Sequence, residues 1–407
     1  MIEQVAIVGA GQAAVQAIDV LRRQHFAGGI TLIGEEAGPP YQRPPLSKGY
    51  LAGTVASERL LLRPRTFYEQ RAVTTLFGRR VEEIVRRERR LRLDDGRTVP
   101  YDALLLATGS RARPLALPGA DLDPVLTLRT AADADRIRAA CAVGGRVVIV
   151  GGGYLGLEVA ATLRAQGAIV TVLEQAGRVL SRVACPPVSA FYTAEHERRG
   201  VRIVCGAGVR EIVAHEGQNR VRAVITEDGE THLADAVVIG AGAQPVTELA
   251  AAAGLACGDG IEVDEYCRTS DLSIYAAGDC THHPSVHYGR KLRLESVDNA
   301  FEQGASAALN LMGRPTPHDK VPWFWSDQYD LKLVIVGIGA DHDAIVLRGD
   351  PAGRAFSACY LRGGELIALE SVNMPRDQLA ARKLIAARAR PDPQRLADPG
   401  RPLQDAC

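Results

Sequence analysis

The stretch VVIVGGGYLGLEVA (147–160) places three glycines in the spacing GxGxxG directly after a run of β-branched residues. Such a run predicts a buried strand, and the apolar residues after the glycines predict a helix. Gly151 allows the tight turn, Gly153 lets the backbone approach a pyrophosphate, and Gly156 lets the helix pack against the strand. Phosphates then lie at the helix N-terminus, where unpaired N–H groups favour negative charge. The stretch therefore predicts a dinucleotide-binding strand–turn–helix unit.

An acidic residue ends the next predicted strand (169–173). Glu174 follows Gly153 by roughly 20 residues, the distance at which a carboxylate binds the ribose hydroxyls of a coenzyme. A carboxylate there disfavours a 2′-phosphate, so we expect this unit to bind NAD(H) rather than NADP(H). Arg178 and Arg182 lie close by in the sequence and weaken that exclusion.

A second unit of the same kind opens the chain. An apolar run leads into GAGQAA, which keeps Gly9 and Gly11 and has Ala14 at the third glycine position, and the next predicted strand ends near Glu35. One such turn could also be an ordinary helix cap, whereas two in register indicate two dinucleotides. The usual pair is a flavin and a nicotinamide, because hydride passes between them.

Strands that end on glycine recur along the chain, at residues 104–109, 236–242 and 274–279. Together with the glycine turns they form an internal repeat of two mononucleotide-type units. Residues 81–99 alternate apolar and charged side chains, which predicts a solvated antiparallel hairpin or meander. The arginines of this segment (86, 87, 89 and 90) are interleaved with acids, so we interpret them as a solvated strand face rather than a nucleic-acid patch.

The composition changes near residues 315–322, where prolines cluster. Beyond this point the pattern predicts antiparallel strands and a last helix rather than another nucleotide unit. The expected strands are 331–337, 344–348, 355–361 and 366–372. We therefore expect a third, smaller α+β domain at the C-terminal end.

The overall composition is that of a globular chain, with 407 residues, 48 basic and 48 acidic side chains and 46% hydrophobic residues. Zero net charge excludes the global field of a nucleic-acid or membrane-surface binder, and the apolar content excludes wholesale disorder. No apolar run is long enough to span a membrane, and we expect no cleaved signal peptide and a cytoplasmic protein. The eight cysteines are scattered without a CxxC pair, which predicts mostly buried free thiols and no metal or iron–sulfur site.

The order of these motifs resembles that of the FAD-dependent, NADH-oxidising ferredoxin and rubredoxin reductases, which include the putidaredoxin reductase type. The resemblance runs nearly end to end, and two of its motifs, PYQRPPLSK and PWFWSDQ, are specific to that branch of the glutathione-reductase-like superfamily. The motifs that carry it are GAGQAA (9–14), PYQRPPLSK (40–48), LLLATGSRARP (104–114), VVIVGGGYLGLEVA (147–160), TVLEQAGRVLSR (171–182), YAAGDC (275–280) and PWFWSDQ (322–328).

The resemblance implies an α/β fold of the glutathione-reductase type, with two Rossmann-like dinucleotide-binding domains and a C-terminal α+β domain. The FAD-binding domain is expected to be discontinuous, because the NAD-binding domain is inserted into it. The expected bounds are 1–112 and 240–318 for the FAD-binding domain, 113–239 for the NAD-binding domain and 319–407 for the C-terminal domain.

The resemblance also implies where the cofactors FAD and NAD(H) are held. The residues expected at FAD are Gly9, Gly11, Ala13, Ala14, Glu35, Lys48, Val81, Ala107, Thr108, Gly109, Arg129, Asp279 and Val297. Those expected at NADH are Gly151, Gly153, Tyr154, Gly156, Glu174, Arg182 and Gly242.

Four residues are expected to take part in the chemistry. The resemblance implies that Lys48 and Glu158 form an ion pair beside the reactive edge of the flavin and that Tyr154 shields the flavin until nicotinamide arrives. Trp325 is expected on the other side of the flavin, toward the partner. A compact cation at Lys48 would stabilise a reduced, anionic flavin.

Simpler structural roles remain open for several of these residues. Asp279 could form a turn through its own side chain, and Lys48 could cap a helix. A carboxylate at Glu158 would in any case be favourable in the first turns of a helix. Trp323 and Trp325, the two tryptophans of the chain, could be core or domain-packing residues.

The function depends on what receives the electrons. Disulphide reductases of the superfamily carry redox cysteines near the end of the early helix of the first domain, but residues 40–50 contain none. Without a thiol the electrons leave the flavin itself, so we expect a separate [2Fe–2S] ferredoxin or rubredoxin to accept them and to serve a cytochrome P450 or a ring-hydroxylating dioxygenase. The alternatives are a flavin reductase acting on a quinone or another small acceptor, and a flavoprotein whose reduction changes its binding partners.

Two features depart from the family pattern or leave it incomplete. Val246 stands where the family usually has asparagine after GAGAQP, which puts the cofactor contact near it in doubt. A local basic patch is needed to dock an acidic ferredoxin, and for each candidate a solvated surface position is the simpler interpretation. The candidates are Arg63, Arg65, Arg290, Lys291 and Arg293.

Overall fold

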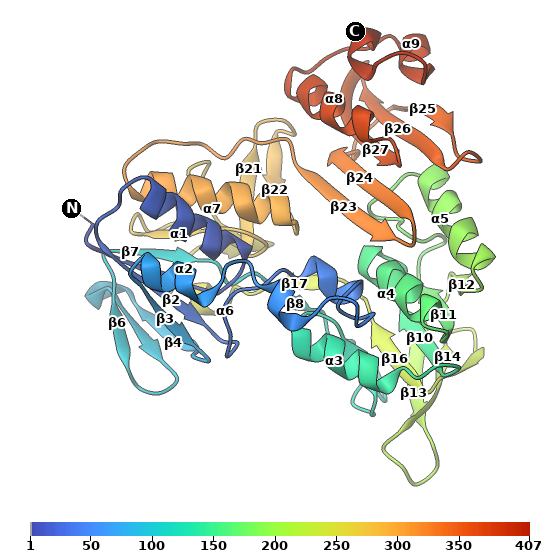
Figure 1. Cartoon of the computed structure of the whole chain (residues 1–407), viewed down its shortest axis with the longest axis horizontal. Coiled ribbons are helices and arrows are strands. Elements are labelled where there is room, and N and C mark those ends of the chain that lie inside the picture. The colour runs from blue at the N-terminus through green and yellow to red at the C-terminus, as the bar shows by residue number, and fades with distance from the viewer. Residues whose placement is uncertain (1) are drawn as a thin grey trace. The chain divides into compact units, whose positions relative to one another are not determined.

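The computed structural model describes residues 2–407, which divide into two compact units (Figure 1). The chain passes between the units five times, and two of these passages lie within the short strands β8 (Ser110–Ala112) and β17 (Ala243–Pro245). Unit 1 comprises the chain up to Gln42, Glu58–Arg111 and Gln244–Pro322, and unit 2 comprises Arg43–Ser57, Ala112–Ala243 and Trp323–Cys407.

Unit 1 is built on a parallel sheet whose strands run in the order β20-β7-β1-β2-β3. The central strand is a continuous apolar run, as expected for a parallel strand that is buried on both faces. The strands are β1 (Gln4–Val8), β2 (Gly29–Gly34), β3 (Val73–Phe77), β7 (Ala103–Leu106) and β20 (Ile274–Ala276).

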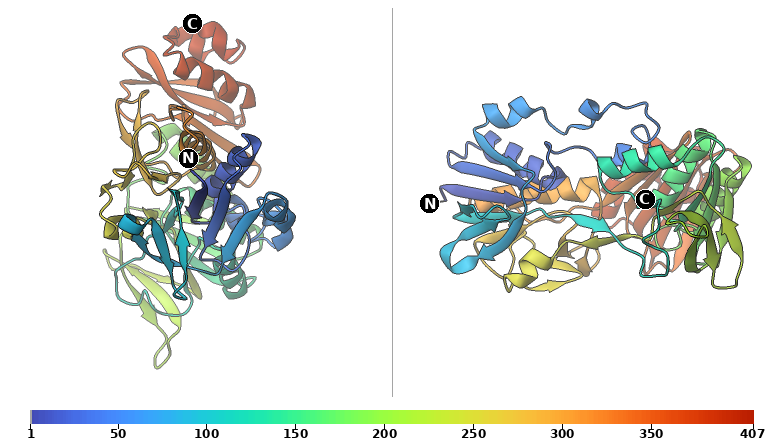
Figure 2. Two further views of the ribbon diagram at one scale, coloured as in Figure 1. Left: turned by 90° about the vertical axis from the view of Figure 1, so that its left-hand side faces the viewer. Right: turned by 90° about the horizontal axis from the view of Figure 1, so that it is seen from below.

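Helices cover one face of this sheet and a strand meander covers the other (Figure 2). Val5 and Ile7 pack with the helices, whereas Ala6 and Val8 pack with the meander, because successive side chains of a strand point to opposite faces. The helices are α1 (Gln12–Arg23), α2 (Arg65–Gln70) and α7 (Val297–Leu311), and the meander is β4 (Val81–Val85), β5 (Arg90–Leu93) and β6 (Thr98–Pro100). The meander predicted for residues 81–99 is therefore confirmed.

The remaining elements of unit 1 are a short helix and a small sheet. The helix α6 (Glu248–Ala252) lies against the meander. A four-stranded sheet contains β18 (Cys257–Gly258), β19 (Gly260–Glu262), β21 (Thr281–Ser285) and β22 (Arg290–Leu292). The strand face expected for the interleaved arginines is wrong for Arg86, Arg87 and Arg89, because the chain turns there between β4 and β5, and only Arg90 lies on a strand. Arg86 forms an ion pair of 2.8 Å with Asp271.

Unit 2 repeats the arrangement with a second parallel sheet in the order β12-β11-β10-β16-β9. The expected internal repeat is confirmed, since β10, α4 and β11 correspond to β1, α1 and β2. The strands are β9 (Val125–Thr127), β10 (Arg146–Val150), β11 (Ile169–Glu174), β12 (Arg202–Cys205) and β16 (Ala236–Ile239). Around this sheet lie helices α3 (Ala131–Ala140), α4 (Tyr154–Ala165) and α5 (Pro186–Arg198) and the meander β13 (Val209–Ala214), β14 (Val221–Thr226) and β15 (Thr231–Leu233).

The C-terminal part of unit 2 is an antiparallel sheet in the order β23-β24-β27-β26-β25. The four strands expected here are confirmed, and β23 is a fifth that the sequence pattern did not predict. The strands are β23 (Trp323–Gln328), β24 (Leu331–Gly337), β25 (Ala344–Asp350), β26 (Ala355–Arg362) and β27 (Glu365–Val372). The helices α8 (Pro375–Ala386) and α9 (Pro393–Ala397) follow them, and short 3₁₀ turns lie at η1 (Pro44–Ser47), η2 (Ser57–Leu60), η3 (Arg86–Glu88) and η4 (Leu403–Ala406).

The α/β fold class expected from the sequence is confirmed, while the three domain bounds (1–112 with 240–318, 113–239 and 319–407) stay a prediction. The eight cysteines are all free thiols. The expectation that most of them are buried is wrong, because only half are; the buried ones are Cys185, Cys267, Cys280 and Cys359. Among residues 2–407, no helix is long and apolar enough to cross a membrane.

Candidate active site

The first glycine turn of unit 1 lies between β1 and α1. A side chain at Gly9 would overlap the Ala107 carbonyl oxygen, and the φ of +103° at Gly9 is in the region that favours glycine. The tight turn follows from this close approach of two strand ends. Gly9 N–H donates to Ile33 O at 2.9 Å, which fixes the turn against β2.

Gly11 forms the open side of the same turn. It is the N-cap residue of α1, and a Cβ built on it would meet no atom within 4 Å. The first turn of α1 contains no acidic residue, and no side chain caps it. The uncapped N–H groups of this first turn and the open space beside Gly11 together fit a phosphate.

Ala13 and Ala14 are buried in α1, because α7 packs closely on this helix. A Cβ on Gly304 of α7 would overlap the Ala13 carbonyl oxygen. Small residues are thus required at this crossing. Glu35 is exposed directly after β2, whereas Val81 is 8% exposed and packs in the core beneath the meander.

The ends of β7 and β20 bring further predicted residues together. Ser110 Oγ donates to Asp279 Oδ2 at 2.8 Å, so the carboxylate is held by a side chain at the start of β8, in the segment that follows β7. Thr108 Oγ1 donates to Val246 O at 2.7 Å, and Val246 N–H donates to Gly109 O at 2.9 Å. The backbone of Val246 thus serves the turn, and neither bond requires the asparagine that the family usually has there.

Val297 is the first residue of α7 and is half-buried. Ser296 caps this helix, because its side chain accepts the N–H of Asn299 at 3.0 Å. In unit 1 the helices α1 and α7 pack against each other, and predicted FAD residues lie at the N-terminal end of each.

The glycine turn of unit 2 has the same construction. A Cβ on Gly156 would overlap the Gly151 carbonyl oxygen, so any larger residue would push α4 away from β10. Gly153 is the N-cap of α4, and a Cβ on it would meet no atom within 4 Å. The turn therefore combines a closed side, where the helix packs, with an open side that a pyrophosphate fits.

Glu174 is fixed by the backbone of this turn. Its Oε2 accepts the N–H of Gly152 at 2.6 Å, and its Oε1 accepts the N–H of Ala176 at 2.8 Å. The carboxylate at the end of β11 is thus oriented by two amides before any ribose arrives.

The two arginines after Glu174 differ in their surroundings. Arg178 donates to the carbonyl oxygens of Ala184 and Ser181, so it is occupied in holding its own loop. Arg182 is exposed, and its guanidinium lies 3.5 Å from the Cβ position of Gly242. Of the two, Arg182 is the cation available to a coenzyme.

The ion pair expected between Lys48 and Glu158 is present in unit 2. Lys48 Nζ lies 2.6 Å from Glu158 Oε2, and the side chains are 22% and 7% exposed. Ser47 Oγ donates to the same oxygen at 2.5 Å. Lys48 also follows η1 directly and its Nζ lies 3.2 Å from Pro44 O, so it has the helix-capping role as well.

Tyr154 begins α4, and its ring contacts that of Phe324 of β23 in a tilted arrangement, with ring centroids 4.7 Å apart. Its hydroxyl donates to Val183 O at 3.2 Å. Burial, and next the Glu370 carboxylate, raise the pKa of the Tyr154 phenol. Trp325 lies on the other face of β23 from Phe324, because strand residues alternate, and its ring stacks on Trp323 at 5.3 Å.

The predicted FAD residues are divided between the two units. Lys48 and Arg129 belong to unit 2, whereas the other predicted FAD residues belong to unit 1. In unit 2, Arg43 donates to the Arg129 carbonyl oxygen at 2.5 Å.

Sequence reasoning missed three residues around Glu158. Ser47 and Ser326 donate to its two oxygens, the latter at 2.7 Å to Oε1, and Gln328 Nε2 donates to Ser326 Oγ at 3.1 Å. The available signal was the alternation of PWFWSDQ, which places Phe324, Ser326 and Gln328 on one face of a strand.

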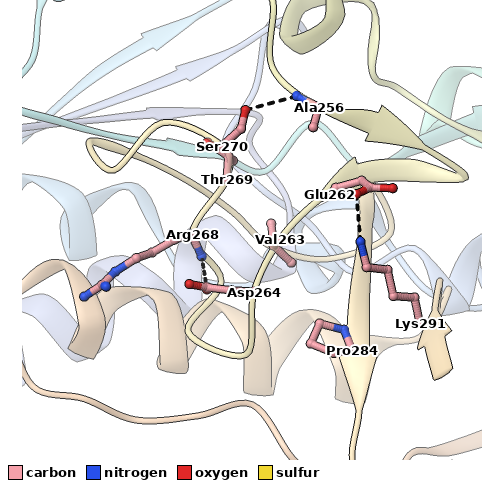
Figure 3. Close-up of a pocket in the computed structure, with 9 residues that line it drawn as sticks. All are labelled: Ala256, Glu262, Val263, Asp264, Arg268, Thr269, Ser270, Pro284 and Lys291. Atoms are coloured by element: carbon pink, nitrogen blue, oxygen red, sulfur yellow. Dashed lines mark hydrogen bonds and ion pairs between the residues drawn. The ribbon is translucent and has the colours of Figure 1, made fainter. Parts of the chain in front are cut away.

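A surface pocket of unit 1 contains none of the predicted site residues (Figure 3). Its Lys291, considered above for docking, forms an ion pair of 2.7 Å with Glu262. Arg293, another such candidate, lies 3.0 Å from Asp259. Both cations are already paired within the unit, which supports their interpretation as ordinary surface residues.

Comparison with known proteins identifies the chain. The model of the pyridine nucleotide-disulphide oxidoreductase family matches residues 3–304, and that of a reductase C-terminal domain matches residues 323–407. The chain belongs to this oxidoreductase family. It is similar to a ferredoxin reductase subunit of 5,5′-dehydrodivanillate O-demethylase from Sphingobium sp., with 44% identity over 98% of this chain and 97% of the relative.

The chain is also similar to putidaredoxin reductase from Pseudomonas putida, with 41% identity over 99% of this chain and 96% of the relative. The crystal structure of the covalent putidaredoxin reductase–putidaredoxin complex matches with a TM-score of 0.96 and 41% identity, over 99% of this chain and 98% of that chain. The resemblance to ferredoxin reductases drawn from the motifs is thereby confirmed.

The residues present fit the two cofactors of this oxidoreductase family, FAD and NAD(H). Each unit offers a helix N-terminus with open space at one glycine, Gly11 or Gly153, where a phosphate would lie. Each also offers a carboxylate directly after the second strand of the repeat, Glu35 or Glu174. Each unit therefore has both the open space for a pyrophosphate and the carboxylate for a ribose that a dinucleotide requires.

Proposed function

We propose that this chain oxidises NADH and passes the electrons through bound FAD to a [2Fe–2S] ferredoxin or a rubredoxin, which serves a cytochrome P450 or a ring-hydroxylating dioxygenase. The family, the two dinucleotide turns and the similarity to ferredoxin reductases support it. FAD supplies the chemistry that joins the two substrates, because it accepts a hydride and releases electrons singly.

The observation that carries the proposal is the environment of Glu158. A disulphide reductase carries its redox thiol in the segment that corresponds to residues 40–50, but here that segment has no cysteine, and its Ser47 and Lys48 contact Glu158. A hydroxyl and an ion pair cannot exchange with a disulphide, so the electrons must leave by another route. A one-electron iron–sulfur carrier is the matching acceptor.

The side chains of the site have distinct roles in the proposal. Gly9, Gly11 and the N-terminus of α1 hold the FAD pyrophosphate, and Asp279 accepts hydrogen bonds from its ribityl chain. Lys48 places a fixed positive charge beside the flavin ring, and Tyr154 covers the ring until nicotinamide displaces it. Trp325, on the far face of β23 from Tyr154, faces the partner.

The other predicted contacts complete the two sites. NADH is held by the turn from Gly151 to Gly156, by Glu174 at the ribose and by Arg182 with Gly242. Domain bounds of 1–112 with 240–318, 113–239 and 319–407 are proposed for the FAD-binding, NAD-binding and C-terminal domains. The match of a reductase C-terminal model to residues 323–407 supports the last of these.

A cytoplasmic location is part of the proposal. Its support is the state of the eight cysteines, which are all free although three of them are exposed. Free exposed thiols persist in a reducing compartment. The location also places the enzyme beside its source of NADH.

The test is NADH-dependent reduction of cytochrome c by the purified yellow protein, with and without a panel of [2Fe–2S] ferredoxins and rubredoxins. We expect the rate to rise strongly with at least one carrier and to remain low without any. Rapid turnover with a quinone and none with any iron–sulfur protein would instead identify a small-molecule reductase. Very slow flavin reduction with a long-lived charge-transfer band would identify a redox-dependent binding protein.

A further inference from the structure

A row of buried polar side chains leads away from Glu158 through β23 to α5. Ser326 Oγ lies 2.7 Å from Glu158 Oε1, and Gln328 Nε2 lies 3.1 Å from Ser326 Oγ. Gln328 Oε1 lies 2.9 Å from His196 Nε2, and the Tyr329 hydroxyl lies 3.1 Å from His196 Nδ1. Ser326, Gln328 and His196 are each at most 1% exposed.

The local structure explains why these residues meet. β23 lies against α4, and its residues on that face are separated by two positions in the sequence. Phe324 therefore reaches Tyr154 at the start of α4, and Ser326 reaches Glu158 one helical turn further on. Gln328, the next residue on this face, meets His196 of α5.

The chemistry of the groups fixes the direction of every hydrogen bond. An ionised carboxylate only accepts, so the single hydroxyl proton of Ser326 is committed to Glu158. Ser326 Oγ then accepts from the Gln328 amide nitrogen, which turns Gln328 Oε1 toward His196. His196 must therefore carry its proton on Nε2 and accept from Tyr329 on Nδ1.

Two side chains at the far end of the row keep the protonation that this direction requires. Burial lowers the pKa of His196 to about 4, with the Arg199 guanidinium acting in the same direction and Gln328 and Glu195 opposing it. Burial raises the pKa of Tyr329 to about 12. At neutral pH the imidazole is neutral and the phenol keeps the proton that it donates.

We propose that Ser326, Gln328 and His196 are positioning residues for hydride transfer, forming a donor chain that fixes the orientation of the Glu158 carboxylate. The inference rests on the proposed function, because it gives the ion pair of Lys48 and Glu158 its place beside the flavin. Glu158 Oε1 is held by Ser326, which leaves Oε2 directed at Lys48. The chain thereby fixes the position of the cation as well.

The first experiment determines the direction of the hydrogen bonds at His196 without measuring turnover. The holoenzyme is labelled with ¹⁵N-histidine, and its nine imidazoles are observed by NMR, with His196 assigned by its absence in His196→Gln. We expect His196 as the neutral Nε2–H tautomer across the neutral range. A proton on Nδ1, or a cationic ring at neutral pH, would overturn the donor chain.

The second experiment measures the rate of flavin reduction by NADH in a single turnover, together with the dissociation constant of NADH. Ser326→Ala removes the one donor to Glu158 Oε1, and we expect the rate to fall about tenfold while NADH affinity stays within about twofold. Ser326→Thr keeps a hydroxyl and should restore most of the rate.

The matched control is Ser371→Ala. Ser371 is as fully buried as Ser326 and belongs to the same antiparallel sheet, but its hydroxyl donates to Met374 O instead of the chain. We expect this variant to reduce flavin at the wild-type rate. Equal rates for Ser326→Ala and Ser371→Ala, whether both normal or both slow, would reject the positioning role.

Failure of the proposed function would look different. In that case the wild-type protein would bind no flavin or would not reduce it with NADH, whatever the state of His196. A wild-type enzyme that reduces its flavin normally while Ser326→Ala and Ser326→Thr behave alike would reject the donor chain and leave the proposed function intact.

Discussion

Lys48 Nζ and Glu158 Oε2 lie 2.6 Å apart, although the strands β3 to β10 and the helices α2 and α3 separate the two residues in the sequence. The pair joins η1 to α4 within one compact unit, and Glu158 is almost completely enclosed. Two hydroxyl donors complete the carboxylate shell. A charge buried in this way depends on its partners, so the pair has a measurable energetic signature.

Removing Lys48 should destabilise the fold more than removing the charge of Glu158. Lys48→Met leaves a buried carboxylate without its cation, and we expect the free energy of unfolding to fall by up to about 3–5 kcal/mol. Glu158→Gln leaves a lysine that water can reach, so its loss should be smaller. Urea unfolding measures both. The control is Lys291→Met, which breaks the half-exposed pair with Glu262 and should cost about 1 kcal/mol or less. Losses of the same size at Lys48 and Lys291 would contradict the buried character of the first pair.

The two glycines of the unit 2 turn should respond differently to alanine. Gly156→Ala places a methyl group on the Gly151 carbonyl oxygen, so we expect a loss of about 1–3 kcal/mol in stability. Gly153→Ala meets no protein atom and should leave stability nearly unchanged, but the methyl group enters the space proposed for the pyrophosphate and should raise the dissociation constant of NADH. Thermal unfolding and NADH titration separate the two effects. Unchanged NADH binding in Gly153→Ala would place the coenzyme elsewhere.

Acid should destabilise the chain in the window where buried histidines resist protonation. Burial lowers the pKa of His196 from 6.5 to about 4. Between these two pH values the imidazole is protonated in the unfolded chain and neutral in the folded chain. Stability is therefore full above pH 6.5 and is lost as the pH falls toward 4, by up to about 3 kcal/mol from this residue. His196→Gln has no such proton to exclude, so its urea midpoint, followed by circular dichroism, should decline less over the same range. Parallel declines in both proteins would assign the effect to other groups.

Asp279 should control flavin retention. Asp279→Ala removes the carboxylate proposed for the ribityl chain, and we expect FAD to bind at least about tenfold more weakly, since hydrogen bonds to charged groups contribute roughly 1.5–3 kcal/mol. The visible flavin absorbance of the dialysed protein measures this. Ser110→Ala removes only the donor that holds Asp279 at 2.8 Å, so it should lose less flavin. Full flavin retention in Asp279→Ala would remove this residue from the FAD site.

The repeated nucleotide units could be predicted from the sequence because their signals are local. Glycine spacing marks each turn, and the apolar runs of β7 and β16 coincide with the strands that the pattern predicts. The ion pair of Lys48 and Glu158 was expected only through the resemblance, because nothing near either residue in the sequence points to the other.

The donor chain could not be predicted, because its contacts join three distant elements. In the sequence, nothing distinguishes Ser326 and Gln328 from other polar residues, and the pattern did not predict the strand on which they lie. Likewise, nothing distinguishes His196 from any other histidine on a helix. The three side chains meet only because β23 contacts both α4 and α5 in the folded chain. Burial of a polar side chain is a tertiary property that the local pattern does not encode.

Both tryptophans of the chain lie on β23, on the same side of that strand, and both belong to unit 2. Intrinsic tryptophan fluorescence therefore reports the unfolding of unit 2, whereas far-ultraviolet circular dichroism reports the unfolding of both units. Denaturation curves that coincide by the two optical probes would mean that the units melt as one cooperative block. Curves that separate would give the stability of each unit from a single unlabelled sample.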